Sequence, residues 1–324
     1  MKAIITGVAG FIGSNLADRL LDLGLTVVGI DNLSTGQNSF IKHLSSNQSF
    51  SFFEEDLLTS NNLTKIFTGS DIVFHLAANA DIRDGLNYPF KDLEQNTIAT
   101  FKVLEAMRSV DVSRIVFSST AAALGESEIF PTPESCPIPI QTSLYGASKM
   151  ACEGLISSYC EGFGFEGYVF RFVSILGPRY PHGHVFDFVK QLLENKERLV
   201  VLGDGTQRKS YLHVSDCIDA LINIGVDIRT AEKSKHRFQT YHLGVEDYCR
   251  VSQSAGWIID ELKLNPVIEF TGGSRGWVGD NPFVFLDVKK AISTGWYPKF
   301  GIEESIRETV SWLVSNQWIF NRRV

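Results

Sequence analysis

The chain has 324 residues, of which 44% are hydrophobic, and 30 basic against 37 acidic side chains give a net charge of −7. A chain of this length buries about three quarters of its unfolded surface, so we expect it to fold without disulfides or a structural metal. The acidic balance argues against non-specific binding to nucleic acid or to an anionic membrane.

The cysteines and the apolar segments predict a cellular location. The five cysteines form no C-x-x-C pair and stand at 136, 152, 160, 217 and 249. We interpret them as buried thiols in a reducing cytoplasm. No apolar run approaches the roughly 20 residues of a membrane span, and the first strand begins too early to leave room for a signal peptide. A cytoplasmic protein without membrane partners is expected.

The first half of the chain alternates short β-rich runs with helix-length segments. Strands are predicted at 2–6, 26–30, 51–54, 71–76, 114–118 and 167–172, and helices at 11–23, 62–67, 96–110 and 148–160. The strands are apolar nearly throughout, which is typical of a parallel sheet covered on both faces. The alternation indicates right-handed βαβ units and therefore an α/β fold with a doubly wound parallel sheet.

The second half is less regular. Helices are predicted at 185–194, 214–223, 252–262 and 302–314, interrupted by Gly- and Pro-containing stretches at 177–183, 203–205 and 272–282. We expect residues 1–176 to form a dinucleotide-binding domain and residues 177–324 a smaller mixed α/β lobe that binds the substrate. Segments near 211–248 are expected to return to the first domain.

A glycine turn follows the first strand. In Gly7-x-x-Gly10-x-x-Gly13, the first glycine makes the tight turn, the second admits a pyrophosphate close to the backbone, and the third lets helix and strand pack. Phe11 and Ile12 lie in the same turn, where free N–H groups and the helix dipole favour phosphate. A glycine turn used only for sheet packing is the alternative.

Asp31 supplies the second half of a dinucleotide motif. It ends the second strand, 21 residues after Gly10. Its carboxylate can accept both ribose hydroxyls and would repel a 2′-phosphate, which favours NAD over NADP.

Further cofactor contacts are predicted where the next strands end. Asp56 could accept from the adenine amine or could instead cap the following turn. Small residues after the fourth strand suit a backbone lying against a cofactor, whereas His75 is expected to be a core histidine. The remaining predicted contacts are Asn32, Leu57, Leu76, Ala77 and Ala78.

Tyr145 and Lys149 are four residues apart on a predicted helix and therefore share one face. A free tyrosine has a pKa of about 10, which a neighbouring ammonium and a positive nicotinamide ring would lower. The lysine could also hold the nicotinamide ribose. Thr120 follows the fifth strand, where its hydroxyl could bond a substrate oxygen and relay its proton, or could simply cap a helix.

Together these motifs resemble those of the extended short-chain dehydrogenase/reductases with a Rossmann fold, and in particular the NAD-dependent nucleotide-sugar epimerases and dehydratases. The UDP-glucose 4-epimerases are the most similar group. The resemblance covers nearly the whole chain, and it continues in Gly177-Pro178-Arg179, Gly203-Asp204-Gly205-Thr206-Gln207-Arg208, Arg275…Gly279-Asp280, Asp287-x-x-Lys290 and Gly295-Trp296-x-Pro298.

The resemblance implies roles for individual residues. Tyr145 would be the base, Lys149 its electrostatic partner, and Thr120 the hydroxyl that bridges to the sugar O4. The substrate contacts implied are Thr120, Tyr145, Ser174, Arg208, Arg275 and Asp280. The two arginines would grip the pyrophosphate of a UDP-linked sugar, a role suited to the guanidinium fork, although a surface ion pair is the alternative. Asp280 would accept from the nucleotide ribose.

The residues after Thr120 bear on the reaction. By the resemblance, a dehydratase would have the sequence Thr-Asp-Glu at this position. In this chain Thr120 is followed by Ala121-Ala122-Ala123, and the next acidic residue is Glu126. Without an acid/base pair, the expected fate of a 4-keto sugar is rotation and return of hydride to its other face. This predicts C4 epimerisation in which NAD is not consumed, and the family resemblance implies that NAD is held tightly. A 4,6-dehydratase and a non-catalytic NAD-binding protein are the alternatives.

Departures from the family pattern leave the sugar open. Ser174 stands where the family often has an amide. By the resemblance, Val284 stands where some epimerases have a bulky tyrosine that excludes N-acetyl groups. The smaller valine suggests a roomier pocket, so an N-acetylated sugar could fit. His182 and His184 lie two apart without a third ligand. We interpret them as a solvated loop or a diphosphate contact and expect no metal.

The resemblance also implies a homodimer that pairs through helices 96–110 and 148–160. The apolar face of Phe101, Val103, Leu104 and Met107 is compatible with such a contact, and core packing explains it equally well.

Overall fold

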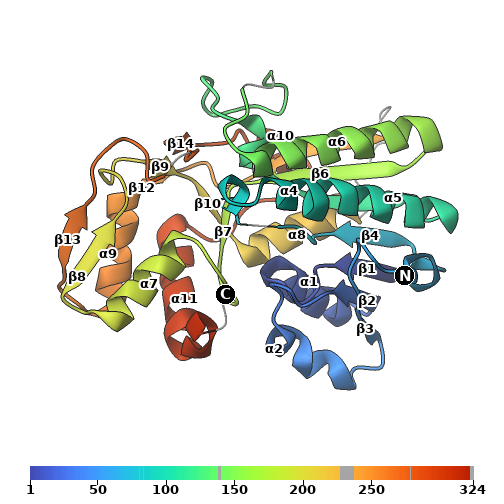
Figure 1. The fold of residues 1–324 in the computed structure, drawn as a ribbon, viewed down its shortest axis with the longest axis horizontal. Coiled ribbons are helices and arrows are strands. Elements are labelled where there is room, and N and C mark those ends of the chain that lie inside the picture. Colours follow the sequence, from blue (N-terminus) through green and yellow to red (C-terminus); the bar gives the residue numbers. More distant parts are fainter. Residues whose placement is uncertain (80, 83, 138–139, 227–236, 278, 322–324) are drawn as a thin grey trace. The chain divides into compact units, whose positions relative to one another are not determined.

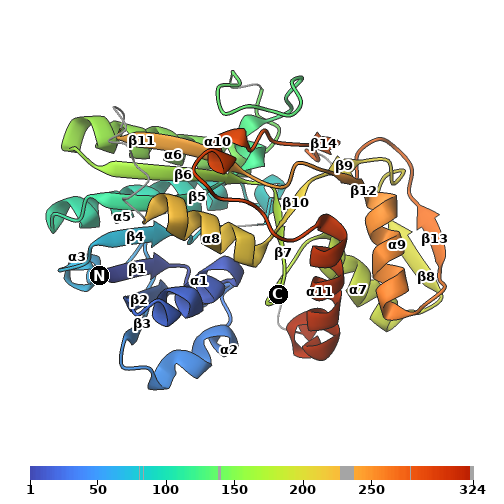
Figure 2. The ribbon, with the colours of Figure 1, turned by 180° about the vertical axis from the view of Figure 1, so that it is seen from behind.

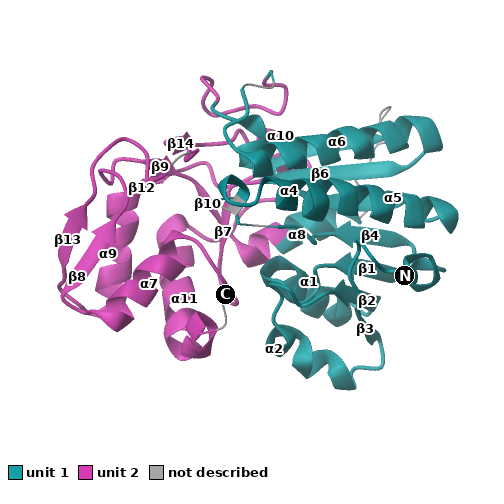
Figure 3. Cartoon of the chain, in the orientation of Figure 1, with its two compact units in different colours: residues 1–126, 137–171, 218–242 teal, residues 127–136, 172–217, 243–324 magenta. Residues whose placement is uncertain are grey.

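The computed structural model describes residues 1–324 except 80, 83, 138–139, 227–236, 278 and 322–324. The chain forms two compact units, shown in Figure 3. The first comprises residues 1–126, 137–171 and 218–242, and the second residues 127–136, 172–217 and 243–324. Within the predicted returning segment near 211–248, residues 227–236 lie outside the described residues.

The first unit is built on a seven-stranded sheet with the strand order β11-β6-β5-β4-β1-β2-β3. Its strands are β1 (Lys2–Thr6), β2 (Thr26–Asp31), β3 (Phe50–Glu54), β4 (Ile72–His75), β5 (Arg114–Thr120), β6 (Glu166–Phe172) and β11 (Phe238–Leu243). β1 pairs in parallel with β2 and β4, β2 with β3, and β4 with β5. The prediction of a doubly wound α/β fold is confirmed, and the strand order reverses direction between β1 and β4.

The helices of this unit connect successive strands. They are α1 (Phe11–Asp22), α2 (Asn38–Ile41), η1 (Lys42–Ser46), α3 (Leu63–Phe67), η2 (Asp84–Leu86), α4 (Pro89–Asp92), the π-helical turn η3 (Leu93–Ile98), α5 (Ala99–Ser109), η4 (Ala121–Leu124), α6 (Leu144–Phe163) and α8 (Val214–Gly225). Figure 1 shows α5 and α6 in front of the sheet, and Figure 2 shows α1 and α8 on its other face. The carboxyl ends of the strands therefore remain the edge at which ligands bind in such sheets.

Burial of the strands follows the sheet order. β1 and β4 are buried along nearly their whole length, as expected for central parallel strands. β3 differs from the prediction, because it is the edge strand and the side chain of Phe53 is 39% exposed. Between the sheet and α3, α5 and α6 lies one continuous apolar core, which includes Val103, Leu104 and Met107.

The second unit has short strands and packed helices. Its elements are β7 (Ser174–Leu176), α7 (His184–Glu194), β8 (Arg198–Val201), β9 (Arg208–Lys209), β10 (Tyr211–His213), β12 (Cys249–Arg250), α9 (Val251–Leu262), β13 (Val267–Phe270), β14 (Phe283–Val284), α10 (Lys289–Ile292), α11 (Ile302–Ser315) and η5 (Gln317–Asn321). β9 pairs with both β12 and β14. The helices α7, α9 and α11 pack on one another, and their apolar faces form the core of this unit.

The cysteines are free thiols, and four of the five are buried as predicted. Cys136 differs, because it is only half-buried. Within the described ranges, no helix combines the length and the apolar character that a bilayer crossing requires.

Candidate active site

The turn between β1 and α1 requires two of its glycines for steric reasons. Gly7 has a φ of +74°, a conformation that favours glycine, and a Cβ there would lie 2.8 Å from the nitrogen of Ala77. A Cβ on Gly13 would lie 2.1 Å from the carbonyl oxygen of Gly7. The chain can therefore place α1 this close to β1 only with glycine at both positions.

The first turn of α1 is suited to a phosphate. Gly10 is the N-cap residue and no side chain caps the helix there. The first N–H groups of an α-helix point out of its N-terminus rather than to carbonyl groups of the helix itself. Free N–H groups at the positive end of a helix dipole bind anions. The cradle formed by the three glycines and this helix end fits a dinucleotide pyrophosphate.

Asp31 is held in place at the end of β2. Its Oδ2 accepts from the backbone N–H of Ala9 at 3.0 Å, and its Oδ1 accepts from that of Leu33 at 2.8 Å. Gly36 packs against the carboxylate, since a Cβ there would lie 2.6 Å from Oδ1. Each carboxylate oxygen can accept a second hydrogen bond, so the group is oriented and retains capacity for ribose hydroxyls. Burial raises the pKa of Asp31.

Asp56 takes part in local turn bonding. Its Oδ1 accepts from the N–H of Leu58 at 2.7 Å, and its Oδ2 accepts from the side-chain amide of Asn32 at 2.8 Å. Asp56 therefore caps the following turn, which was the alternative to a contact with adenine. The buried Leu57 follows it directly.

His75 is a core histidine, as predicted. It is fully buried, its Nδ1 lies 2.7 Å from Oγ1 of Thr6 and its Nε2 lies 2.9 Å from Oγ1 of Thr100. Burial lowers the pKa of His75 to about 3, with a further contribution from the charge of Lys149. The Oγ1 of Thr6 also accepts from the backbone of Leu76 and Ala77, which ties the end of β4 to β1.

Thr120 and Tyr145 are hydrogen-bonded to each other. Thr120 ends β5, and its hydroxyl also accepts from the N–H of Ala122 at 3.1 Å, so it caps η4 as well. Tyr145 lies in the first turn of α6, which the Ser143 hydroxyl caps by accepting from Gly146 at 3.0 Å. The structure brings these two predicted residues together.

Lys149 follows one helical turn after Tyr145 and is 2% exposed. Its Nζ donates to the carbonyl oxygen of Ser118 at 2.8 Å, lies 4.6 Å from the ring centre of Phe117 and 6.0 Å from that of Tyr145. Burial lowers the pKa of Lys149 to about 8, against the raising effect of nearby Cys152, Glu153 and Asp92. The ammonium is therefore still mostly protonated at neutral pH.

The expected lowering of the pKa of Tyr145 is not found in the chain by itself. Burial raises this pKa well above its ordinary value, the carboxylate of Asp92 raises it further, and the hydrogen bond with Thr120 lowers it. Desolvation of the buried Tyr145 phenol, which residue spacing does not reveal, is the largest effect on this pKa.

A buried polar cluster beside Tyr145 was missed by the sequence reasoning. Asp92 and Asn96 are each 1% exposed. The Oδ1 of Asp92 accepts from the amide of Asn79 at 2.8 Å, and the amide of Asn96 donates to the hydroxyl of Ser148 at 2.8 Å. The cluster surrounds η3, and π-helical turns occur frequently at functional sites. The sequence signal was a run of polar residues before an amphipathic helix.

The positions after Thr120 carry no acid. Ala121 and Ala123 are buried, and Glu126, the first carboxylate after Thr120 in the sequence, is exposed.

In the second unit, neighbouring residues of β9 face different surroundings, because side chains alternate along a strand. The guanidinium carbon of Arg208 lies 3.7 Å from the ring centre of Phe283 and 5.6 Å from that of Tyr248. Lys209, which the sequence analysis did not select, instead places its Nζ 2.7 Å from Oδ1 of Asp280. Strand alternation was the signal that could have separated the two.

Asp280 belongs to an internal network. Its Oδ2 accepts from the N–H of Gly276 at 3.0 Å, and its backbone carbonyl accepts from Nη1 of Arg275 at 2.7 Å. Arg275 is therefore anchored in the loop that contains Asp280, and Lys209 of β9 is tied to the same loop by its ion pair with Asp280. Ser174 is exposed at the start of β7.

The interpretation of His184 as part of a solvated loop is wrong. It begins α7, and its Nε2 lies 2.9 Å from the hydroxyl of Ser254. Burial lowers the pKa of His184 to about 4. The ring of His182 stacks on that of Tyr180. Among the described residues, no group of three or more His, Cys, Asp or Glu side chains could hold a metal ion.

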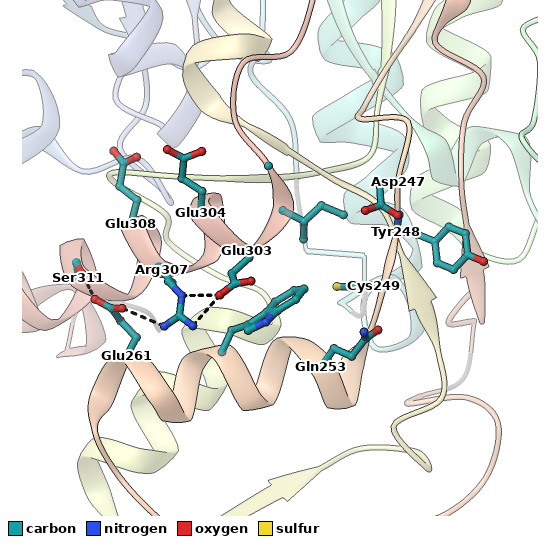
Figure 4. Close-up of a pocket in the computed structure, with 13 residues that line it drawn as sticks. Asp247, Tyr248, Cys249, Gln253, Glu261, Glu303, Glu304, Arg307, Glu308 and Ser311 are labelled. Atoms are coloured by element: carbon teal, nitrogen blue, oxygen red, sulfur yellow. Dashed lines mark hydrogen bonds and ion pairs between the residues drawn. The ribbon is translucent and has the colours of Figure 1, made fainter.

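A separate pocket of about 880 Å³ lies between α9 and α11 (Figure 4). Its charged lining residues are Asp247, Glu261, Glu303, Glu304, Arg307 and Glu308. Arg307 is paired with Glu303 at 2.7 Å and with Glu261 at 3.3 Å. The excess of carboxylates would repel a diphosphate, so this pocket does not suit a nucleotide.

Comparison with known proteins identifies the family of this chain. A model of the NAD dependent epimerase/dehydratase family matches residues 3–239. The chain belongs to this family.

The following three proteins are similar to this chain over nearly its whole length. The uncharacterized UDP-glucose epimerase YtcB of Bacillus subtilis (strain 168) is 34% identical, over 97% of this chain and 98% of its own. A crystal structure of UDP-galactose 4-epimerase is 34% identical with a TM-score of 0.86, covering 98% of this chain and 100% of that one. UDP-glucuronic acid 4-epimerase from Bacillus cereus, solved with UDP-glucuronic acid and NAD, is 26% identical with a TM-score of 0.87, covering 97% and 99%.

NAD is the cofactor of this epimerase/dehydratase family member. The residues of the first unit fit it, because the glycine turn leaves space that a Cβ would fill and Asp31 is oriented by two backbone N–H groups.

Proposed function

We propose that the protein is an NAD-dependent nucleotide-sugar 4-epimerase that acts on a UDP-linked hexose. The observation that carries this proposal is the hydrogen-bonded pair of Thr120 and Tyr145, with Lys149 one turn away and alanines instead of carboxylates after Thr120. This set can move one proton at the C4 hydroxyl, but it lacks the acid and base that elimination of water across C5 and C6 would need.

Each catalytic residue has one role. Tyr145 accepts the proton of the C4 hydroxyl and later returns it, and Thr120 holds the C4 oxygen next to the phenol. A bound NAD, held by the glycine turn and Asp31, would supply the acceptor for a hydride from C4 and the donor for its return to the other face of the sugar. Lys149 places a positive charge beside the phenol, which favours the phenolate. A positive nicotinamide ring would act in the same direction against the raising effect of burial.

The two units have different proposed ligands. The first would hold NAD through its glycine turn, Asp31 and Asn32, together with Asp56, Leu57, Leu76, Ala77, Ala78, Tyr145 and Lys149. The second would bind the nucleotide through Ser174, Arg208, Arg275 and Asp280. We add Lys209 to this set, because its paired ammonium stands in the same loop network as Arg275 and Asp280. A positive charge there would complement a diphosphate.

We also infer that the protein works as a homodimer in the reducing cytoplasm. In the first unit, Phe90 of α4, Phe101 of α5, and Leu144 and Phe163 of α6 expose large apolar side chains, and such surfaces mark interfaces. The five free thiols support a reducing compartment.

The activity can be tested by proton NMR of the purified protein with UDP-glucose, UDP-N-acetylglucosamine or UDP-glucuronic acid and no added NAD. The anomeric signal of a C4 epimer is expected, and it would show that NAD co-purifies. Tyr145→Phe removes the proton acceptor and should lower the rate by about 10²- to 10⁴-fold. The variant should still purify with NAD, measured by absorbance after denaturation, because the glycine turn and Asp31 are unchanged.

Two other outcomes would contradict the proposal. A 6-deoxy-4-keto product would make the protein a dehydratase despite the alanines after Thr120. No turnover of any of the three sugars, even with added NAD, would indicate another nucleotide or a non-catalytic role.

A further inference from the structure

A buried ion pair joins α6 to β6 in the first unit. The carboxylate of Glu153 accepts from Arg171 at 2.7 Å through Nη2 and at 3.0 Å through Nε, and the two side chains are 5% and 9% exposed. Nη1 of Arg171 lies 3.4 Å from Nε2 of the fully buried His242 on β11. The guanidinium and the carboxylate are thus paired in a bidentate arrangement, the strongest geometry for these groups.

The same carboxylate reaches the strand that carries Thr120. The hydroxyl of Ser119 donates to Oε1 of Glu153 at 2.5 Å. One turn earlier on α6, Lys149 donates to the carbonyl oxygen of Ser118 at 2.8 Å. Two successive residues of β5 therefore hold two successive turns of α6. This fixes the register between Thr120, the next residue of β5, and Tyr145, one turn before Lys149.

Packing alone does not require a charged pair at this position. Apolar side chains of similar volume often stabilise a core as well as a buried ion pair does, or better. What an apolar pair cannot supply is a negative charge one turn from Lys149. The groups that face Lys149 are Tyr145, Cys152 and Glu153 of α6, Asp92 of α4 and His75 of β4. Arg171 of β6 and His242 of β11 lie beyond Glu153.

We propose that the Glu153–Arg171 pair is a positioning device for the reaction. Glu153 holds α6 against β5, and its charge, tempered by Arg171, helps to keep Lys149 protonated. The inference rests on the proposed function, since it assigns Glu153 and Arg171 a role in the chemistry of Tyr145 and Lys149. Consistent with it, Glu153 opposes the lowering of the pKa of Lys149 that burial causes.

Single neutral variants separate the two charges. Glu153→Gln leaves Arg171 unbalanced, so the pKa of Lys149 should fall by about one unit and the alkaline limb of the kcat–pH profile should move down equally. Arg171→Gln leaves Glu153 unbalanced and should move both in the opposite direction. The double variant E153Q/R171Q should return both to near the wild-type values. The pKa is followed in the NAD-loaded protein by ¹³C NMR of ε-labelled lysine, with the signal assigned from Lys149→Arg.

The Arg114–Glu166 pair is a matched control. It joins β5 to β6 with an Nη2–Oε2 distance of 2.7 Å and is more exposed than the Glu153–Arg171 pair. It lies at the opposite end of β5, about 20 Å along the strand from Thr120. Arg114→Gln and Glu166→Gln should leave the titration of Lys149 unchanged. If Glu153→Gln and Arg171→Gln lower stability and leave that titration within about 0.2 unit of wild type, the pair is structural only and the proposal is overturned.

Ser119→Ala tests the positioning role without changing any charge, which matters if a charge variant does not fold. We expect kcat to fall about 10-fold, with KM and the alkaline limb unchanged, and a wild-type kcat would overturn this role. If the wild-type protein shows no epimerase activity, the proposed function fails. The NMR titrations of Glu153→Gln and Arg171→Gln would still decide the electrostatic coupling, so the two failures are distinguishable.

Discussion

At the scale of single residues, burial decides the charge states in the site. Lys149 and His75 both lose basicity because water is excluded from them, and the pKa of Tyr145 rises for the same reason. A pair of residues four apart in the sequence shows that two groups are neighbours, but it does not show how much water surrounds them.

The adjacent cations of β9 yield a prediction at this scale. Lys209→Met and Arg208→Met should each weaken UDP binding about 10-fold, measured by calorimetry, because each removes a proposed charge-assisted hydrogen bond to the diphosphate. Lys209→Met should also lower the free energy of unfolding by about 1–3 kcal/mol, since it leaves the buried Asp280 carboxylate without its ion pair. Arg208 is exposed and stacks on aromatic rings, so its variant should be nearly as stable as wild type.

Wild-type UDP affinity of the Lys209→Met protein would restrict Lys209 to a structural role. Arg208→Met would then be the variant that tests the diphosphate contact.

His75 makes stability depend on pH. Its folded-state pKa of about 3 lies below its unfolded value of about 6.5, so the unfolded state binds more protons between these values. Stability from this group is complete above pH 6.5 and falls by about 1.4 kcal/mol per pH unit as the pH decreases toward 3. The free energy of unfolding, measured with urea, should fall between pH 7 and pH 5. This fall should be about 2 kcal/mol smaller for His75→Gln than for wild type.

Equal losses in wild type and His75→Gln would show that His75 does not carry this dependence.

At the scale of secondary-structure elements, a helical pattern can have two explanations. Val103, Leu104 and Met107 of α5 are fully buried in the core of the first unit, whereas Phe101 is 45% exposed. Core packing, the alternative weighed for this apolar face, thus accounts for three of its four residues. The fourth points elsewhere, because at about 100° per residue Phe101 lies about 110° around the helix from the centre of the other three.

The packing of α1 yields a second prediction. Gly13→Ala should lower the free energy of unfolding by about 1–3 kcal/mol or more, because its Cβ would lie 2.1 Å from the carbonyl oxygen of Gly7. The variant should also purify with less NAD. Gly256 of α9 is the matched control, since no atom lies within 4 Å of a Cβ there. Gly256→Ala should stabilise the protein by about 0.4–1 kcal/mol. Equal stabilisation by Gly13→Ala would contradict the tight packing of the turn.

At the scale of the whole molecule, the exposed apolar side chains of α4, α5 and α6 lead to a prediction of assembly. Light scattering at micromolar concentration should give the mass of a dimer, and Phe101→Glu should give that of a monomer, because it places a charge in the apolar contact. Tyr297→Glu, at a 61% exposed residue of the second unit, should leave the dimer intact. A monomeric wild-type protein would overturn the proposed homodimer.

The sequence by itself determined the fold class and the cofactor motif, and it predicted the proposed catalytic pair. These depend on local patterns: the alternation of strands and helices, the spacing of three glycines before a helix, and the four-residue step from Tyr145 to Lys149. Only the tertiary structure decided which polar residues surround that pair. Asp92 of α4 and Arg171 of β6 lie far from Tyr145 along the chain. They come near the pair because α4 packs against α6 and Arg171 pairs with Glu153 of α6. Burial is likewise a property of the packed unit, so the direction in which the pKa of Tyr145 shifts could not be obtained from its sequence neighbours.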